Sequence, residues 1–551
     1  MSENLSHLLG RKGPEKTLFD ELGQFREPGV SPSQEKILQL RKEFLVGTST
    51  VAGSLSFYDF LQPENRGKKA YICNGSACLT AGTQENLRQN LLRFLPESEI
   101  GTLCCLGRCH ENHAFQIHGQ NYSGADAQNL EQLVAENTPT KEKYHIAHLG
   151  TPILTGPIEN LNSWYNQWAE FLNRNPEEAL QELKSSGLRG RGGAGFSMAF
   201  KLEACRKETH EPRFLVCNAD EGDPGAFSDR YLMEEQTHKL LLGMMMTGFL
   251  MNARWGIIYI RGEYPESITA VENGIAWLRQ QNLIGENLFG TGFSFDFKIV
   301  KALGAYICGE ETALLSSIEG QRPEVRIRPP YPTQKGLFNQ PTVVNNVETL
   351  ANLPYIFAFG SQAFRDIGTG KSTGTKLVSL DSHFQKPGLY EVDMGTPLVQ
   401  LIQEAGGFRV PVKAMHIGGP LGGLVPTAKI NDLNIDFESF SSNGFLLGHA
   451  SVVCIPDTFP IIRYLQHLFQ FTAHESCGKC FPCRLGSVRG AELLENAASN
   501  REKIDTQLFQ DLLETMEIGS LCALGGGLPL PMRNALQYFQ DELSTYFSHK
   551  A

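Results

Sequence analysis

The stretch Leu188-Arg-Gly-Arg-Gly-Gly-Ala-Gly-Phe196 decides which kind of α/β fold the centre of the chain adopts. Within it, Gly190 to Gly195 matches the G-x-G-x-x-G string of dinucleotide-binding folds. A strand precedes that string in those folds, whereas residues 176–186 have the spacing of a helix. The context therefore argues against a Rossmann fold and predicts a glycine-rich loop between helices.

The loop also carries positive charge. Arg189 and Arg191 lie within it, and Lys201 follows shortly afterwards. Bare backbone amides combined with cationic side chains make a good phosphate cradle. A tight structural turn is the alternative interpretation, and the loop alone does not separate the two.

Two acidic strings follow predicted strands, and an amide-rich string lies farther along the chain. Asn218-Ala-Asp-Glu-Gly-Asp-Pro-Gly225 follows a strand over 214–217, and Gly309-Glu-Glu-Thr-Ala313 opens a helix that Gly320 ends. Carboxylates at a helix start are often only partners of the helix dipole. Strand ends, however, are where α/β proteins bind ligands. The string Asn345-Asn-Val-Glu-Thr349 adds amide donors that suit a flavin ring.

The thirteen cysteines are unevenly distributed. Without a secretory signal they are not expected to form disulfides. Five lie between Cys73 and Cys109, and a second group lies near the C-terminus. The others stand in apolar or strand-like settings and are expected to be buried small side chains: Cys205, Cys217, Cys308 and Cys454.

The C-terminal group places three thiols on one tight turn, Cys477-Gly-Lys-Cys480-Phe-Pro-Cys483. Cys522, from a separate helix end, can reach them. Four convergent thiolates suit a [4Fe–4S] cluster. They also suit structural zinc, and the spacing leaves both open. The fourth cysteine and following proline of a ferredoxin run are absent from this motif.

The N-terminal group is Cys73-Asn-Gly-Ser-Ala-Cys78 followed by Cys104-Cys105-Leu-Gly-Arg-Cys109. Each pair follows a predicted strand, so two loops would present the thiols together. A [2Fe–2S] cluster needs four ligands, and we expect Cys73, Cys78, Cys105 and Cys109, because Cys104 points away if the strand continues its alternation. Structural zinc or a reactive dithiol is the alternative.

Composition bounds the class of protein. A chain of 551 residues is too long for one core, and 41% hydrophobic with 20% charged residues is typical of globular domains. The net charge of −11 argues against nucleic-acid or anionic-membrane partners. Residues 240–260 are apolar enough to suggest a membrane span, but Asn252 and Arg254 favour a buried helix, a turn and a strand. With no targeting signal evident, we expect a cytoplasmic protein.

The chain divides into five parts by pattern. Residues 1–65 form a short, partly helical preface with helical spacing over 31–44, and residues 138–156 read as a linker. The parts that follow the preface are a small α/β unit over 66–140, a large α/β region over 150–365, a glycine-rich region of short strands over 370–450, and helices over 455–551. In the small unit we expect strands at 69–73, 99–103 and 115–118 and helices at 83–94 and 126–136.

Together these strings resemble one family. They are similar to the flavoprotein subunit shared by complex I, NAD-linked hydrogenases and NAD-linked formate dehydrogenases, and the resemblance covers about 150–540. The strings that carry it are Leu188–Phe196, Asn218–Gly225, Ala305-Tyr-Ile-Cys-Gly-Glu-Glu-Thr-Ala-Leu314, Val344–Thr349 and Glu475-Ser-Cys-Gly-Lys-Cys480. Residues 20–140 resemble the family's thioredoxin-like [2Fe–2S] subunit, here fused in front. Residues 370–450 resemble its ubiquitin-like, soluble-ligand-binding β-grasp domain. The implied fold is multidomain α/β.

The resemblance implies a full set of cofactors: FMN, NAD(H), a [4Fe–4S] cluster on Cys477, Cys480, Cys483 and Cys522, and a [2Fe–2S] cluster. It also implies which residues surround the flavin and the dinucleotide. These are Gly190, Arg191, Gly192, Gly193, Phe196, Lys201, Asn218, Asp220, Glu221, Tyr306, Gly309, Glu310, Glu311, Asn345, Asn346 and Thr349.

Two positions depart from the family pattern. An aromatic residue often stands where this chain has Ala204, so stacking on the adenine is expected to be weaker. Many relatives have glutamate where Asp223 stands. A carboxylate there should repel the extra phosphate of NADPH, so we expect Asp223 to favour NAD(H).

The expected function is that of a diaphorase, an oxidoreductase that passes electrons between NAD(H) and iron–sulfur clusters. NAD(H) exchanges two electrons as hydride and a cluster accepts one, so a flavin must stand between them. No side chain need act as a nucleophile, although Glu310 or Glu311 could orient the nicotinamide. Expected partners are a hydrogenase or formate dehydrogenase catalytic subunit and a small iron–sulfur subunit. The rival interpretations are a flavin-free iron–sulfur scaffold and a zinc-stabilised nucleotide-binding regulatory protein.

Overall fold

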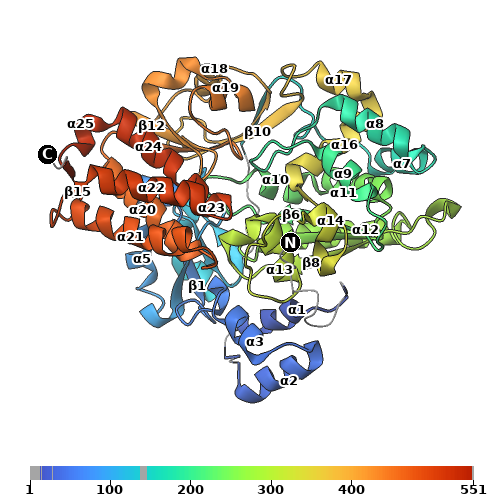
Figure 1. Cartoon of the computed structure of the whole chain (residues 1–551), viewed down its shortest axis with the longest axis horizontal. Coiled ribbons are helices and arrows are strands. Elements are labelled where there is room, and N and C mark those ends of the chain that lie inside the picture. The colour runs from blue at the N-terminus through green and yellow to red at the C-terminus, as the bar shows by residue number, and fades with distance from the viewer. Residues whose placement is uncertain (1–12, 14, 28, 31, 137–144, 549–551) are drawn as a thin grey trace.

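The computed structural model describes residues 13, 15–27, 29–30, 32–136 and 145–548. Figure 1 shows the C-terminal helices on the left, N-terminal helices at the bottom, and the middle of the chain across the top, centre and right of the molecule. Four sheets lie in the described part of the chain, with four, six, two and four strands. The multidomain α/β architecture expected from the sequence is confirmed.

The N-terminal preface is helical and packs against the central sheet. Its elements are α1 Leu18–Leu22, η2 Gly23–Arg26, α2 Gln34–Phe44, α3 Thr48–Leu55 and η3 Asp59–Leu61. The ring of Phe19 lies 5.3 Å from that of Tyr58 and 6.1 Å from that of Tyr259 in the central sheet. The expected helix over 31–44 is confirmed from Gln34 onward; residue 31 lies outside the described residues.

The small α/β unit has the strand order β2-β1-β3-β4. Its elements are β1 Ala70–Cys73, α4 Ser76–Ala81, α5 Gln84–Leu91, η4 Glu97–Glu99, β2 Ile100–Leu103, β3 Phe115–Ile117, β4 Gln120–Tyr122, η5 Gly124–Gln128 and α6 Leu130–Ala135. The three expected strands are confirmed. The helix expected over 126–136 is split, because a 3₁₀ turn precedes α6.

The large region is built on a parallel sheet in the order β8-β7-β6-β9. Its strands are β6 Phe214–Ala219, β7 Trp255–Ile260, β8 Asp296–Lys301 and β9 Thr342–Asn346. The chain runs outward through β6, β7 and β8, then returns to place β9 on the other side of β6. The strand order therefore reverses between β6 and β9, and ligands of open α/β sheets bind at such a point.

Helices cover both faces of this sheet (Figure 1). They are α7 Leu161–Phe171, α8 Pro176–Ser186, α9 Met198–Arg206, α10 Ser228–Glu235, α11 Thr237–Met251, α12 Pro265–Gln280, η6 Leu288–Gly290, η7 Tyr306–Gly309, α13 Glu311–Ile318, α14 Pro332–Lys335, η8 Leu337–Asn339, α15 Val347–Ala351, α16 Leu353–Phe359 and α17 Ser361–Arg365. The predicted helix before the glycine-rich loop is confirmed as α8.

The apolar run over 240–260 is a helix, a turn and a strand, as expected. The helix α11 ends at Asn252, which adopts φ +53°, and β7 begins at Trp255. Both elements are buried in the core. Across the described ranges, no helix combines the length and the apolar character that a membrane crossing requires.

The glycine-rich region forms a six-stranded sheet in the order β13-β12-β14-β10-β11-β5. Its elements are β5 Ile146–Leu149, β10 Thr375–Leu380, β11 Gly388–Asp393, α18 Leu398–Glu404, β12 Val412–Ile417, β13 Gly423–Pro426, η9 Thr427–Asp432, α19 Phe437–Ser442 and β14 Ser451–Pro456. The linker expected over residues 138–156 is wrong in part, because it contains a strand of this sheet. Residues 137–144 lie outside the described residues, but β5 is a strand that pairs in parallel with β11. The sheet also extends past residue 450, because β14 pairs with β10 and β12.

The C-terminal region is helical, as expected. It contains α20 Ile461–Glu475, α21 Phe481–Ala498, α22 Thr506–Gly519, α23 Ala523–Gly527, α24 Pro529–Tyr538 and α25 Gln540–Leu543, with the small pair β15 Ile504–Asp505 and β16 Phe547–Ser548. Figure 1 shows α20 and α21 beside the small α/β unit. Ser76 of α4 and His467 of α20 lie 3.1 Å apart (Oγ to Nε2), which brings the two cysteine groups into one part of the molecule.

Candidate functional site

The candidate site lies where the strand order reverses, at the carboxyl ends of β6 and β9. Asn218 and Asn346 pair across these two strands. The glycine-rich loop lies against the same edge, because a Cβ added to Gly192 would stand 2.9 Å from the Cβ of Asn346. The backbone nitrogen of Arg191 donates to Oγ1 of Thr349 over 2.9 Å. Three of the strings singled out in the sequence therefore meet at this edge, the position at which open α/β sheets form their ligand crevice.

The loop is built for close approach of a ligand. Gly193 has φ +138°, a conformation that favours glycine, and a Cβ added there would meet nothing within 4 Å. Arg191 is fully buried, and burial lowers its pKa to about 10. Its Nε and Nη1 have no hydrogen-bond partner among the described residues. Such unsatisfied buried donors call for an acceptor that a bound phosphate or polar ring would supply.

Two more buried polar atoms at this edge lack partners within the described chain. They are Oδ2 of Asp220, just after β6, and Nδ2 of Asn345, at the end of β9. Desolvation raises the pKa of Asp220 to about 8. A buried acceptor and a buried donor without partners, both at the strand ends of this sheet edge, are the kinds of group that the polar edge of FMN would satisfy.

Glu221 holds the next helix in place. Its carboxylate accepts hydrogen bonds from the backbone nitrogens of Asp229 (2.9 Å) and Arg230 (3.0 Å) in the first turn of α10. Burial raises its pKa to about 7. Asn218 instead donates from Nδ2 to the carbonyl of Gly309 over 2.8 Å, which joins the first acidic string to the second.

The two glutamates of the second acidic string make different contacts. Glu310 caps α13, since its Oε2 accepts from the backbone nitrogens of Thr312 (2.9 Å) and Ala313 (2.8 Å). Glu311 pairs with Lys201 over 3.2 Å and with Arg328 over 3.2 Å. One oxygen of Glu310 is thus the dipole partner of a helix, while Glu311 belongs to a partly exposed charged cluster at the mouth of the crevice.

Tyr306 links this crevice to the C-terminal cysteines. Its ring lies 4.9 Å from Phe471 of α20, and its backbone nitrogen donates to Oε2 of Glu475 over 2.8 Å. Glu475 is buried and stands two positions before Cys477. The crevice and the first cysteine are therefore connected through one residue.

The four C-terminal cysteines come from three helix boundaries. Cys480 is the N-cap of α21, Cys483 lies in its first turn, and Cys522 is the N-cap of α23. The helices approach closely, because a Cβ added to Gly525 would stand 2.7 Å from the Cβ of Cys483. Burial raises the pKa of Cys483 to about 11 and that of Cys522 to about 12, so a metal must displace these protons. The positive ends of two helices favour an anionic cluster of thiolates.

The N-terminal cysteines also converge. The sulfur atoms of Cys105 and Cys109 lie 3.3 Å apart, and Cys73 and Cys78 are buried beside them. Hydrogen bonds from Cys109 and Cys73 lower the pKa of Cys105. Gly107 has φ +68° and presses on Tyr264, so the turn between Cys105 and Cys109 requires glycine.

Cys104 lies at the edge of this group, because a Cβ added to Gly75 would stand 3.5 Å from the sulfur of Cys104 and 3.5 Å from that of Cys73. Strand β2 ends at Leu103, so the condition that the strand alternation continues through Cys105 is not met. Cys104 also lines a cavity of about 510 Å³, together with Asp59, His474 and Glu475. Cys73 touches the same cavity. It lies between the small α/β unit and α20.

Sequence reasoning missed two residues of this region, Phe200 and His449. Phe196 is 49% exposed and Phe200 is 58% exposed, and their rings lie 5.5 Å apart in an edge-to-face arrangement. Phe200 stands one helical turn before Ala204 on α9. Its separation of four residues from both Phe196 and Ala204 is the signal that could have identified it. His449, the second feature, contacts Asp229 from the six-stranded sheet, and no local pattern marks it.

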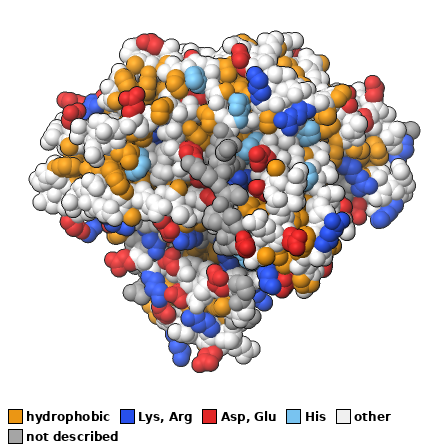
Figure 2. Space-filling view, turned by 180° about the vertical axis from the view of Figure 1, so that it is seen from behind, with side chains coloured by type: hydrophobic (Ala, Val, Ile, Leu, Met, Phe, Trp, Pro, Cys, Tyr) orange, Lys and Arg blue, Asp and Glu red, His pale blue; other side chains and the backbone are white. Residues whose placement is uncertain are grey.

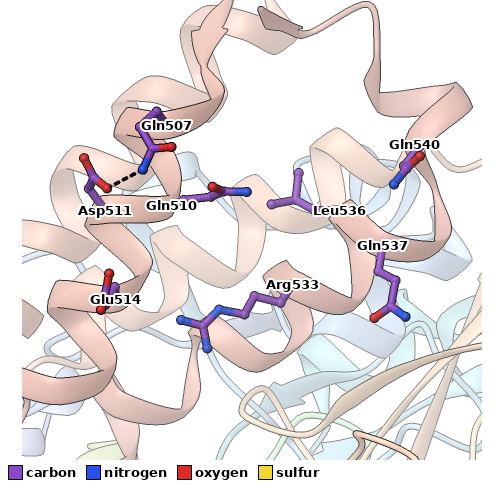
Figure 3. Close-up of a pocket in the computed structure, with 8 residues that line it drawn as sticks. All are labelled: Gln507, Gln510, Asp511, Glu514, Arg533, Leu536, Gln537 and Gln540. Atoms are coloured by element: carbon purple, nitrogen blue, oxygen red, sulfur yellow. Dashed lines mark hydrogen bonds between the residues drawn. The ribbon is translucent and has the colours of Figure 1, made fainter. Parts of the chain in front are cut away.

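The remaining surface offers a contrast. Figure 3 shows a polar groove of about 480 Å³ between α22, α24 and α25, lined by amide and charged side chains with one hydrogen bond between Gln507 and Asp511. None of the predicted site residues lines it. On the face drawn in Figure 2, acidic and basic side chains are interspersed.

The chain matches three described protein families. Residues 183–355 match the Nuo51 FMN-binding domain, residues 463–546 match the NADH-ubiquinone oxidoreductase-F iron-sulfur binding region, and residues 383–425 match the SLBB domain. The first match contains the glycine-rich loop and both acidic strings. The second contains all four C-terminal cysteines.

Similar proteins belong to several redox complexes. An NADH-quinone oxidoreductase subunit of Rhizobium meliloti is 40% identical over 379 residues, which is 68% of this chain and 90% of that protein. NADP-reducing hydrogenase subunit HndC of Solidesulfovibrio fructosivorans is 38% identical over 70% of this chain and 79% of its own length. The crystal structure of an NAD⁺-reducing [NiFe]-hydrogenase in the air-oxidized state contains a chain with 28% identity and a TM-score of 0.85; 98% of this chain and 96% of that chain are covered.

Proposed function

Because this chain belongs to the family of FMN- and iron–sulfur-containing, NADH-binding oxidoreductase subunits found in NADH-quinone oxidoreductases, we propose that it is the NAD(H)-reacting diaphorase of a larger redox complex. It transfers electrons between NAD(H) and iron–sulfur clusters. The observation that supports this best is the crevice between β6 and β9. There, an open glycine loop lies against the end of β9, and buried atoms of Arg191, Asp220 and Asn345, all within or next to these segments in sequence, have no hydrogen-bond partner among the described residues.

FMN, when bound, takes two electrons as hydride from a nicotinamide and releases them one at a time to a cluster. The chain's residues bind and orient. The loop amides from Gly190 to Gly193 would hold the phosphate, and Asn345 and Asp220 would meet the polar edge of the ring. Glu311, with Lys201 and Arg328 beside it, would orient the nicotinamide at the mouth.

The clusters complete the path. Cys477, Cys480, Cys483 and Cys522 would ligate [4Fe–4S], and Cys73, Cys78, Cys105 and Cys109 would ligate [2Fe–2S]. The convergence of four thiols in each group supports both assignments. The domains would then be a thioredoxin-like unit over 66–140, an FMN- and NAD(H)-binding unit over 150–365, a ubiquitin-like unit over 370–450 enlarged by β5 and β14, and a helical cluster-binding unit over 455–551.

An apolar patch beside the C-terminal cysteines suits an electron-transfer partner. Phe481, Leu485 and Val488 are exposed at positions i, i+4 and i+7 of α21. Ile518 and Leu521 adjoin them, since Gly519 lies against Pro482. The occupant we propose is the small iron–sulfur subunit of the complex, because electrons leaving a cluster at Cys480 and Cys522 need an acceptor held close to these partly exposed residues.

The test is to purify the protein without oxygen and measure FMN, iron and NADH-dependent reduction of an artificial electron acceptor. The proposal expects about one FMN and about six iron atoms per chain, four from one cluster and two from the other. Reduction should require NADH and bound FMN. A preparation with full iron but no flavin and no NADH oxidation would instead identify a cluster-carrying scaffold.

A further inference from the structure

The six-stranded sheet contributes two buried cations to the region around the crevice. His449, just before β14, lies with Nε2 3.4 Å from Oδ2 of Asp229 and 3.7 Å from Oε1 of Glu221. Lys376 of β10 pairs with Glu348 of α15, and both side chains are fully buried. Each carboxylate belongs to the crevice region, and each cation comes from the other sheet.

His449 stands at the centre of this arrangement. The ligand atoms of His449, Glu221 and Asp229 lie within 4.8 Å of one another, and all three residues are buried. The remaining ring nitrogen, Nδ1, has no hydrogen-bond partner in the described part of the chain, so its polar contacts run through Nε2. Two carboxylates this close repel each other unless a positive charge lies between them. The side chains of Asp229 and Glu221 raise the pKa of His449 to about 9 against the opposing effect of burial.

The contacts of Asp229 extend to the glycine-rich loop. Its carboxylate accepts hydrogen bonds from Nδ2 of Asn346 and from the backbone nitrogen of Glu348. Asn346 in turn caps α15 by accepting from the nitrogen of Thr349, whose hydroxyl accepts from the nitrogen of Arg191. On the other side, Glu221 belongs to the string that ends β6.

We propose that His449, as an imidazolium, is a positioning residue of the flavin site, which clamps Glu221 and Asp229 together and thereby fixes the three segments that hold FMN. This proposal rests on the proposed function, because it assumes that FMN occupies the crevice. The six-stranded sheet then supplies the charge balance of the crevice in addition to packing against it. Loss of the charge should loosen FMN before it unfolds the chain.

The experiment compares the dissociation constant of FMN in the full protein carrying His449→Gln and in a control carrying His416→Gln. His416 is an equally buried histidine on β12 of the six-stranded sheet, bonded to Tyr464 and to the carbonyl of Gly422, and burial lowers its pKa to about 4. We expect His449→Gln to weaken FMN binding about tenfold or more, because two buried carboxylates lose their counter-charge. His416→Gln should change FMN binding less than about twofold, and iron content should be unchanged in both.

Two further variants separate charge from packing. Adding Asp229→Asn to His449→Gln removes one of the two repelling charges and should recover FMN affinity to within about threefold of the wild type. His449→Lys keeps a positive charge and should retain most of the affinity, which also covers the case in which the glutamine variant does not fold. Failure of both rescues would show that only the shape of the histidine matters.

The wild-type protein adds a pH test. His449 faces Glu221, Asp229 and Asp223 together with the more distant cation Lys376. The pKa of His449 lies near 9 and that of Glu221 near 7, so the charges of this pair are present together between these values, and the positive charge is lost as pH rises through about 9. FMN affinity should fall over that rise in the wild type, and His449→Gln should show no such fall.

The outcomes are distinct. A wild type that binds no FMN contradicts the proposed function itself. A wild type that binds FMN, with His449→Gln binding it equally well, contradicts only the role of His449. A stoichiometric divalent metal at the triad would also contradict it, since an imidazolium cannot ligate a metal.

Discussion

The phenol of Tyr306 donates a hydrogen bond to Oδ1 of Asp223 over 2.7 Å. Asp223 is the residue whose charge the sequence predicts to discriminate between NADH and NADPH, and Tyr306 also bonds Glu475 beside the cluster motif. A Cβ added to Gly419 would stand 2.4 Å from Cγ of Asp223, so the six-stranded sheet confines this carboxylate from the other side. The carboxylate of Asp223 is therefore held in place on two sides.

Replacing Asp223 by asparagine should narrow the preference for NADH over NADPH by roughly tenfold, because one repelling charge disappears. Asparagine keeps an acceptor for Tyr306, so the fold should persist. The measurement is kcat/KM for both nucleotides, with Asp432→Asn on the exposed turn η9 as the control. The wild type is itself a test, because one relative is a subunit of an NADP-reducing hydrogenase. Equal use of NADH and NADPH by the wild type would contradict the selectivity assigned to Asp223.

Phe200 should contribute to dinucleotide binding in place of an aromatic residue at Ala204. Phe200→Ala removes an exposed ring beside Phe196 and should raise KM for NADH about fivefold to tenfold while leaving kcat nearly unchanged. Adding Ala204→Phe to that variant should restore most of the affinity. Phe359→Ala, an equally exposed ring on α16, serves as the control. An unchanged KM in Phe200→Ala would show that adenine is held elsewhere.

The two adjacent cysteines should behave differently when replaced by serine. Cys105→Ser should remove or shift the [2Fe–2S] EPR signal and lower iron from about six to about four atoms per chain, because its sulfur lies against Cys109. Cys104→Ser should leave signal and iron unchanged, since Cys104 lines the neighbouring cavity. Reversed results would make Cys104 the ligand. NADH should still reduce FMN in both variants, because the crevice belongs to another domain.

The apolar patch on α21 should be needed for partner binding and dispensable for diaphorase activity. Leu485→Glu or Val488→Glu places a charge in the expected interface and should weaken binding of the small iron–sulfur subunit by about tenfold or more. Reduction of a small artificial acceptor should be unchanged. Arg489→Glu, an exposed change on the same helix, is the control. Undiminished binding in both patch variants would place the interface elsewhere.

Local patterns were sufficient for much of the fold. The helix α8 and the helix–turn–strand over α11 and β7 follow from periodicity and from Asn252 as a left-handed cap. The strand β5 was missed because four residues in a polar segment become a strand only through pairing with β11, more than two hundred residues later. Sequence separation hides His449 in the same way. It meets Asp229 across 220 positions, where the turn before β14 packs against α10.

The parts of the candidate site that are short sequence motifs were predictable. The glycine-rich segment after a helix and the acidic and amide segments farther along the chain were recognisable, and the reversal of strand order between β6 and β9 explains where they meet. The hydrogen-bond partners of the individual side chains in these segments could not be predicted. One carboxylate oxygen of Glu310 caps α13. One carboxylate oxygen of Asp220 has no partner among the described residues. This difference depends on three-dimensional contacts.

The most direct test of the account is the optical spectrum of the oxygen-free purified protein before and after one addition of NADH. If the proposed function is right, a flavin band will bleach on addition of NADH, and EPR signals of reduced clusters will appear in the same sample. A protein that lacks the flavin band, or whose flavin and clusters stay oxidised in excess NADH while a chemical reductant reduces them, would contradict it.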